Sequence, residues 1–460
     1  MNLRISDRAI IVGACAYLVV LSLGMVRLSY DVWGVLIVLP PLALLGYLGI
    51  QRMFSGELAD LANVMLVGFV AKAAGTMARY WVSFDAYGGA TDAQRYHSRA
   101  VVAVDAYWHG NASLWSVLPG GTGTAFMERL TSFFYTFMGS SRLAAFFVFS
   151  FMSFWGVALF VKAACAAVPG LARRRYAMLC VFAPSLLYWP SSIGKEAWMM
   201  LCLGVATWGV ALLVSRRGFV RATVFLFLGI GGAALVRPHI GGLWLVGLMP
   251  ALLVSLLRGR GPRHVRGGGL VDRLVLLALI GVALVAIGAV GSATVRYLQP
   301  SGEENITSNS VTSILTETTR RTSEAGSNFQ PVVITGPTDW PYASVRTLVR
   351  PLLIEAKGLA QLVSALELTL FGGLVVANLR RLANLPRLVL TNPYVAFAMT
   401  VLFFGGLAYA SFANLGVLTR QKSLLFPMLL LVLCLPEHSP RSPQHPSVAS
   451  ARELNVMAAR

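Results

Sequence analysis

Residues 197–214 read AWMMLCLGVATWGVALLV, a run with no charged side chain. As a helix rising about 1.5 Å per residue, the run is about 27 Å long, close to the roughly 30 Å hydrocarbon core of a bilayer. Similar apolar runs recur along nearly the whole chain. The sequence therefore predicts helices that cross a membrane.

Composition agrees with this interpretation. The chain has 460 residues, of which 56% are hydrophobic and 12% are charged, and its mean hydropathy is +0.68. A soluble domain would carry about 25% charged residues. We predict an all-α integral membrane protein with about twelve transmembrane helices in one domain, residues 1–435. The expected helices are 9–26, 32–50, 61–80, 143–161, 177–190, 197–214, 222–236, 240–257, 274–295, 359–378, 393–411 and 424–435.

The net charge of +19 would suggest nucleic acid in a soluble protein, but the positions of the arginines favour another interpretation. Arg/Lys clusters follow an even number of predicted crossings each time, at 173–175, 216–221, 258–273 and 380–387. Under the positive-inside rule both termini are then cytoplasmic. We therefore expect a lipid bilayer and no nucleic acid as partner.

The same topology places two long loops, residues 81–142 and 296–358, on the outer side. The tail at 436–460 has the composition of a disordered cytoplasmic end. The first apolar run lacks an A-x-A-like cleavage site after it, so we expect it to be a retained helix.

The five cysteines, at positions 15, 165, 180, 202 and 434, lie in or beside apolar runs without CxxC spacing. They are typical of small packing residues, and we expect no metal site and no cofactor. The Gly-Lys pair at 194–195 does not form a P-loop, because Trp189 and Glu196 stand where glycine and Ser/Thr are required.

Polar motifs gather on the predicted outer side. They are TDAQRYH (91–97), SSIGKE (191–196), RPH (237–239), RPLLIEAK (350–357) and NLGVLTRQK (414–422). The neighbouring runs 177–190, 222–236 and 424–435 are too short for a full span at about 1.5 Å per residue. The motifs beside them are therefore expected in a recess below the outer surface, where charge is tolerated. Local thinning of the bilayer is the alternative explanation.

Asp92 and Tyr96 are four residues apart, so on a helix they share a face, and His97 lies beside them. A carboxylate, a phenol and an imidazole together can bind a sugar hydroxyl or accept its proton. The structural alternative is that these residues only begin a helix. Lys195, Arg237, Arg350, Arg420 and Lys422 make a basic set that suits phosphate.

Two further charges, Lys72 and Glu367, fall inside apolar runs. Paired with each other, they would lower the cost of burying both. A purely structural role and a role in transport both fit this pattern.

An outer-loop acid in a DAxxYH setting, followed by PSSIGKE, RPH and NLGxxxRQK…P, resembles bacterial multi-pass proteins of envelope-polysaccharide assembly. These are the Wzy-type oligosaccharide repeat-unit polymerases and the GT-C-like glycosyltransferases. The resemblance implies a polyprenyl-pyrophosphate-linked sugar as substrate, arginines that hold the pyrophosphate, and Asp92 as the base. It also implies a bacterial plasma (inner) membrane location and other envelope-assembly proteins as partners.

From these observations we expect a glycosyltransferase or polymerase that acts on polyprenyl-phosphate-linked saccharide at the outer face. The expected catalytic residues are Asp92, Glu196 and His97. The expected substrate-binding residues are Tyr96, Lys195, Arg237, His239, Arg350, Glu355, Lys357, Arg420 and Lys422. A transporter or flippase for a lipid-linked or anionic solute is the main alternative, and a non-catalytic membrane subunit is the third.

Overall fold

The computed structural model describes residues 7–113, 116–118, 120–257, 277, 280–289, 291–292, 319–320, 322, 329–332, 334, 336–356 and 358–437. All regular elements among these residues are helices. Part of the predicted span 274–295, about half of the loop 296–358 and the tail after residue 437 lie outside the described residues, as does Lys357.

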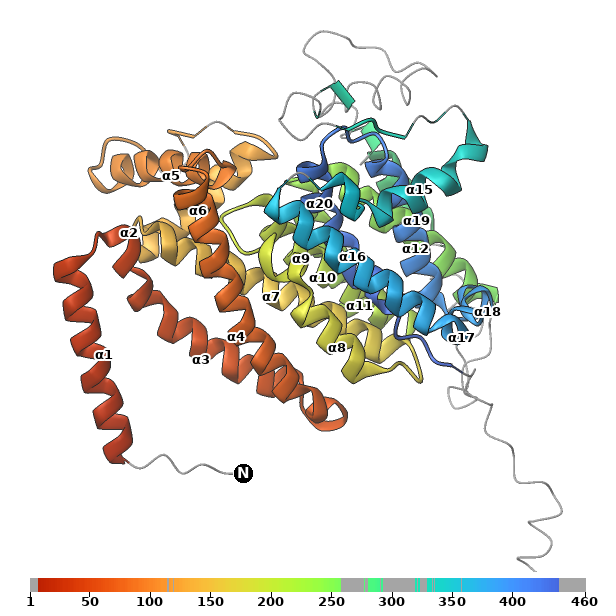
Figure 1. Cartoon of the computed structure of the whole chain (residues 1–460), viewed down its shortest axis with the longest axis horizontal. Helices are drawn as coiled ribbons and strands as arrows, with labels where there is room; N and C mark the ends of the chain where they lie inside the picture. The colour runs from red at the N-terminus through yellow and green to blue at the C-terminus, as the bar shows by residue number, and fades with distance from the viewer. Residues whose placement is uncertain are drawn as a thin grey trace, which may run out of the picture.

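The first half of the described chain runs from α1 to α12 (Figure 1). Its helices are α1 Asp7–Arg27, α2 Tyr30–Trp33, α3 Val35–Met53, α4 Ala59–Trp81, α5 Asp92–Trp108, α6 Thr124–Met138, α7 Arg142–Ala167, α8 Arg173–Phe182, α9 Pro184–Tyr188, α10 Lys195–Val214, α11 Phe219–Ala234 and α12 Pro238–Leu257. The second half contains α15 Trp340–Val349, α16 Leu359–Ala377, α17 Leu379–Leu382, α18 Leu385–Thr391, α19 Pro393–Tyr409, α20 Leu415–Lys422 and α21 Phe426–Val432.

Seven helical segments of the described chain are long and apolar enough to cross a membrane. An eighth is obtained if the pair α18–α19, bent by 114°, counts as one span. The seven are Tyr30–Met53, Gly56–Ala86, Arg142–Ala167, Lys195–Val214, Pro238–Leu257, Leu359–Ala377 and Leu415–Val432. A helical protein with several segments able to span a membrane is thus confirmed, whereas the predicted number of twelve is not.

Two segments differ from the expected pattern. The segment 81–142, expected as a loop, contains the helices α5 and α6. The motif at 414–422, also expected outside a helix, forms α20 and continues through a short 3₁₀ turn into α21. Asn414 begins α20, because its side chain accepts a hydrogen bond from the Val417 N–H at 3.0 Å, which is the usual role of asparagine at a helix start.

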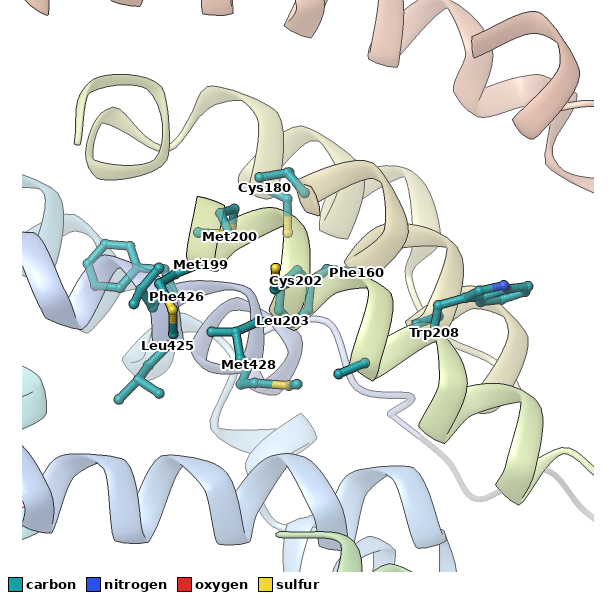
Figure 2. Close-up of a cluster of buried hydrophobic side chains, with 14 of the residues drawn as sticks. Phe160, Cys180, Met199, Met200, Cys202, Leu203, Trp208, Leu425, Phe426 and Met428 are labelled. Atoms are coloured by element: carbon teal, nitrogen blue, oxygen red, sulfur yellow. The ribbon is translucent and has the colours of Figure 1, made fainter. Parts of the chain in front are cut away.

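Close glycine contacts hold the centre of the fold together. A Cβ added to Gly156 of α7 would lie 2.2 Å from the Met200 carbonyl oxygen of α10. One added to Gly204 of α10 would lie 2.4 Å from the Gly156 oxygen. Glycines allow two helix backbones to approach this closely. Figure 2 shows the side chains of α10 in the core, with Phe160 and Cys180 on one side and Leu425, Phe426 and Met428 on another.

The predicted helix 177–190 is broken in the structure. It ends at Phe182, and α9 begins at Pro184 after Ala183, whose ψ of 119° is not helical. Proline disfavours a helical conformation in the residue before it and has no N–H of its own, which explains the break. The segment that follows, residues 189–194, is irregular and buried within the protein.

Lys72 and Glu367 bind the broken segment and not each other. Lys72 Nζ donates to the Leu186 carbonyl oxygen at 2.7 Å. The Glu367 carboxylate accepts from the Ser185 N–H at 3.1 Å and from its hydroxyl. A helix break leaves backbone donors and acceptors without partners, and leaving these unpaired inside a membrane is costly. The two charged residues therefore satisfy the ends of α9, and the expected Lys72–Glu367 pair does not form.

The two ends of the bundle differ in charge pattern. In Figure 1, α5 and α20 lie at the upper end, and α17 lies toward the opposite end. At the α17 end, Arg175 donates to Asn378 at 2.8 Å, Arg173 pairs with Asp60 at 3.3 Å, and Arg381 pairs with Glu437 at 2.9 Å. Arg173, Arg175 and Arg381, which belong to two of the arginine-rich segments, thus lie away from α5 and α20.

Candidate functional site

Four charged residues from distant parts of the chain meet at the α5–α20 end. Asp92 is the first residue of α5, Glu196 lies in the first turn of α10, Arg237 joins α11 to α12, and Arg420 lies in α20. Three ion pairs connect them. Arg420 pairs with Asp92 at 2.9 Å and with Glu196 at 2.8 Å, and Arg237 pairs with Glu196 at 2.9 Å. We call these four residues the charged cluster.

Glu196 is the centre of the charged cluster. Its Oε1 atom accepts from Nη2 of Arg237 and from Nε of Arg420. The Glu196 and Arg237 side chains are 4% and 6% exposed. A buried carboxylate needs such partners, because an unpaired charge inside a protein is costly. Glu196 therefore holds the two guanidinium groups side by side.

The solvent exposure of the side chains increases from Glu196 through Arg420 to Asp92. The Arg420 side chain is 26% exposed and that of Asp92 is 51% exposed. Asp92 is thus the carboxylate of the cluster that a ligand reaches first. The geometry separates the roles of the two acids, with Glu196 inside as an organiser and Asp92 at the surface.

Lys195 and Tyr96 extend the cluster through Thr124, the first residue of α6. Lys195 Nζ donates to Thr124 Oγ1 at 3.0 Å. Tyr96 is 1% exposed, and burial, together with the nearby Asp92 and Glu196 carboxylates, raises its pKa. The Tyr96 phenol therefore keeps its proton at neutral pH. With Lys195 included, three cations face two carboxylates, so the site has an excess of positive charge.

Two donors near the cluster have no hydrogen-bond partner among the described residues. They are Nη1 of Arg237 and the hydroxyl of Tyr409, and both atoms are buried. Tyr409, the last residue of α19, interacts electrostatically with Arg237 and Glu196. Sequence reasoning missed Tyr409 and Thr124, because a tyrosine ending an apolar run and a threonine after glycines carry no distinctive signal.

Arg350, Glu355 and Lys422 form a separate group. Arg350 pairs with Glu355 at 2.9 Å and donates to the Gln330 carbonyl oxygen at 3.1 Å. Lys422 Nζ donates to the carbonyl oxygens of Leu348, at 3.0 Å, and of Arg350. Lys422 follows Arg420 by two residues, which is about 200° around a helix, so the two side chains point apart. The five predicted basic residues thus divide between two places.

The two predicted histidines occupy different surroundings. His97 Nδ1 lies 2.6 Å from the Tyr135 hydroxyl, and its Nε2 lies 3.8 Å from Asp31. It therefore contacts α6 and α2, whereas its neighbour Tyr96 faces the cluster. His239 lies in the first turn of α12, two residues after Arg237, and is partly buried.

Among the described residues, no group of three or more His, Cys, Asp or Glu side chains is arranged to hold a metal ion. Compared with protein-family models, curated proteins and solved structures, the chain matches none of them.

Proposed function

We propose that the protein transfers glycosyl groups from polyprenyl-phosphate-linked sugars at the outer face of a bacterial plasma membrane. The observation that carries this proposal is the charged cluster with Lys195, which collects three cations and two carboxylates at one end of a helical bundle. A guanidinium group donates two parallel hydrogen bonds to phosphate oxygens, and an ammonium group adds a compact positive charge. A lipid-linked phosphate would reach such a site from the bilayer.

In the proposed reaction, an acceptor hydroxyl oxygen forms a bond to C1 of the donor sugar. The bond between C1 and the phosphate oxygen breaks, and its electron pair leaves with the lipid phosphate. Asp92 accepts the hydroxyl proton, because it is the more exposed of the two carboxylates. Lys195, Arg237 and Arg420 stabilise the charge that develops on the leaving phosphate.

The orientation belongs to the same proposal. With the arginine-rich end inside, the charged cluster faces outward and both termini are cytoplasmic, as in the twelve-span topology. The single-cysteine variants Asp105→Cys and Arg380→Cys, each in a chain without its native cysteines, test this orientation. We expect an impermeant maleimide to label position 105 in intact cells and position 380 only after permeabilisation. The reverse pattern would place the cluster inside and exclude an outer-face reaction.

A transporter or flippase for a lipid-linked or anionic solute is the second candidate. The observation that favours it is the broken pair α8–α9, with Lys72 and Glu367 bound to its backbone. Discontinuous helices line the substrate sites of many transporters. In that case the charged cluster would bind the solute without reacting with it.

Deletion of the gene, followed by analysis of lipid-linked glycans, separates the candidates. If single lipid-linked saccharide units accumulate on the outer face, glycosyl transfer is supported. If they accumulate on the inner face, a flippase is supported. Complementation of the deletion strain with the Asp92→Asn variant then tests whether Asp92 is the base. The matched control is Asp105→Asn, on the same helix. Unchanged glycans in the deletion strain would exclude both functions.

A further inference from the structure

The ion pair between Asp92 and Arg420 is the most exposed of the three ion pairs in the charged cluster. Arg420 uses Nε for Glu196 and Nη1 for Asp92. The Glu196 side chain is 4% exposed, whereas that of Asp92 is 51% exposed. Water screens a half-exposed pair strongly, so Asp92 is the partner that Arg420 can exchange at low cost.

The rest of the site has donors available for an incoming anion. Nη1 of Arg237 and the Tyr409 hydroxyl have no hydrogen-bond partner among the described residues. Lys195 donates to a neutral hydroxyl, that of Thr124, which a charged acceptor can replace. A phosphate group would therefore find an excess of cations and unused donors beside Arg420.

We propose that a phosphate-bearing ligand and Asp92 compete for Arg420, so that ligand binding releases the Asp92 carboxylate. A guanidinium group binds phosphate through two parallel hydrogen bonds, which a ligand at Arg420 gains by displacing Asp92. This inference rests on the proposed function, in which Asp92 is the base. Asp92 then becomes available to accept a proton only when the donor phosphate is in place.

The competition has a measurable consequence for anion affinity. Full-length protein in lipid nanodiscs is titrated with inorganic pyrophosphate and with farnesyl pyrophosphate at constant ionic strength. We expect Asp92→Asn to bind both ligands about fivefold more tightly than the wild type, the size of a half-exposed ion pair. Asp105→Asn, the same change about 20 Å along the same helix, should bind as the wild type does. Tighter binding of the farnesyl ligand indicates a lipid-linked source, and equal binding indicates a free phosphate.

The same substitution in an Arg420→Gln variant distinguishes competition for Arg420 from general electrostatic repulsion between Asp92 and the anion. In the Arg420→Gln background, competition predicts that Asp92→Asn no longer changes the affinity. A remaining fivefold gain there would overturn the proposal, as would equal or weaker binding by Asp92→Asn alone. Asp92→Ser serves as a second variant, with circular dichroism and unfolding temperature as checks of folding.

The outcome is distinguishable from failure of the proposed function, because binding requires no transfer. A fivefold gain in Asp92→Asn together with unchanged glycans after gene deletion supports the competition and rejects the glycosyl transfer. Altered glycans after gene deletion, together with unchanged anion affinity in Asp92→Asn, support the glycosyl transfer and reject the competition. If neither the wild type nor Asp92→Asn binds either ligand, both proposals are wrong.

Discussion

Nε of Arg420 lies 2.8 Å from Oε1 of Glu196, although the two residues are 224 positions apart in the chain. This contact joins the end of α20 to the first turn of α10 and brings a second guanidinium group beside Arg237. Glu196 thus acts as a fixed point for two cations. Replacing Glu196 should therefore lower the stability of the protein.

Glu196→Gln is expected to lower the free energy of unfolding by about 3–5 kcal/mol, because it leaves the buried Arg237 charge without its carboxylate. Asp60→Asn is the matched control, since it removes the half-exposed partner of Arg173; a loss under about 1 kcal/mol is expected there. Unfolding in detergent measures both. The double variant Glu196→Gln/Arg237→Gln should recover part of the loss, and a further loss would contradict the assigned pairing.

Replacing Glu367 tests whether it caps α9 or carries protons. Glu367→Gln keeps an oxygen that can accept from the Ser185 N–H, whereas Glu367→Ala leaves that buried donor without a partner. We expect Glu367→Ala to cost about 1–3 kcal/mol of stability and Glu367→Gln to cost less. A capping role predicts that Glu367→Gln retains function in the glycan assay. Loss of function at unchanged stability would instead support transport.

His97 gives a prediction for pH dependence. Burial is the main cause that lowers its pKa below the ordinary 6.5, Arg142 lowers it further, and Asp31 opposes them. Well above pH 6.5 the imidazole is neutral in both the folded and the unfolded state. As the pH falls below 6.5, the unfolded state binds a proton that the folded state resists, so stability decreases until the pH is below the folded pKa.

Thermal unfolding between pH 8 and pH 5 measures this effect. We expect His97→Asn, which keeps a polar group near the Tyr135 hydroxyl, to weaken the loss of stability toward low pH. His109→Asn is the control, because His109 lies just past the end of α5 and is exposed. An unchanged pH profile in His97→Asn would show that another group is responsible.

The sequence predicted much of the charged cluster but not its internal connections. The positions of the arginine clusters predicted the orientation of the helices, and this topology placed Asp92, Glu196, Arg237 and Arg420 on one side of the predicted membrane. Which residues pair depends on the register of each helix. Lys422 points away from Arg420 because both lie in the helix α20, two residues apart, and this segment is expected outside a helix from the sequence alone.

The number of spans was harder to predict, because hydropathy does not show where a helix breaks. An apolar segment reads as one helix even when Pro184 divides it into α8 and α9. Lys72 and Glu367 appeared as an unusual pair of buried charges for the same reason. Their partners are backbone groups that become available only through the break.

The contact between α7 and α10 depends on glycine at position 156. Gly156→Ala would place a methyl group 2.2 Å from the Met200 carbonyl oxygen, so the helices must move apart, at an expected cost of about 1–3 kcal/mol. Gly231→Ala in α11 is the matched control, because an added Cβ meets nothing within 4 Å there. Its better helix propensity should leave stability unchanged or raise it by up to about 1 kcal/mol. Equal unfolding temperatures for the two variants in detergent would contradict the close packing of α7 against α10.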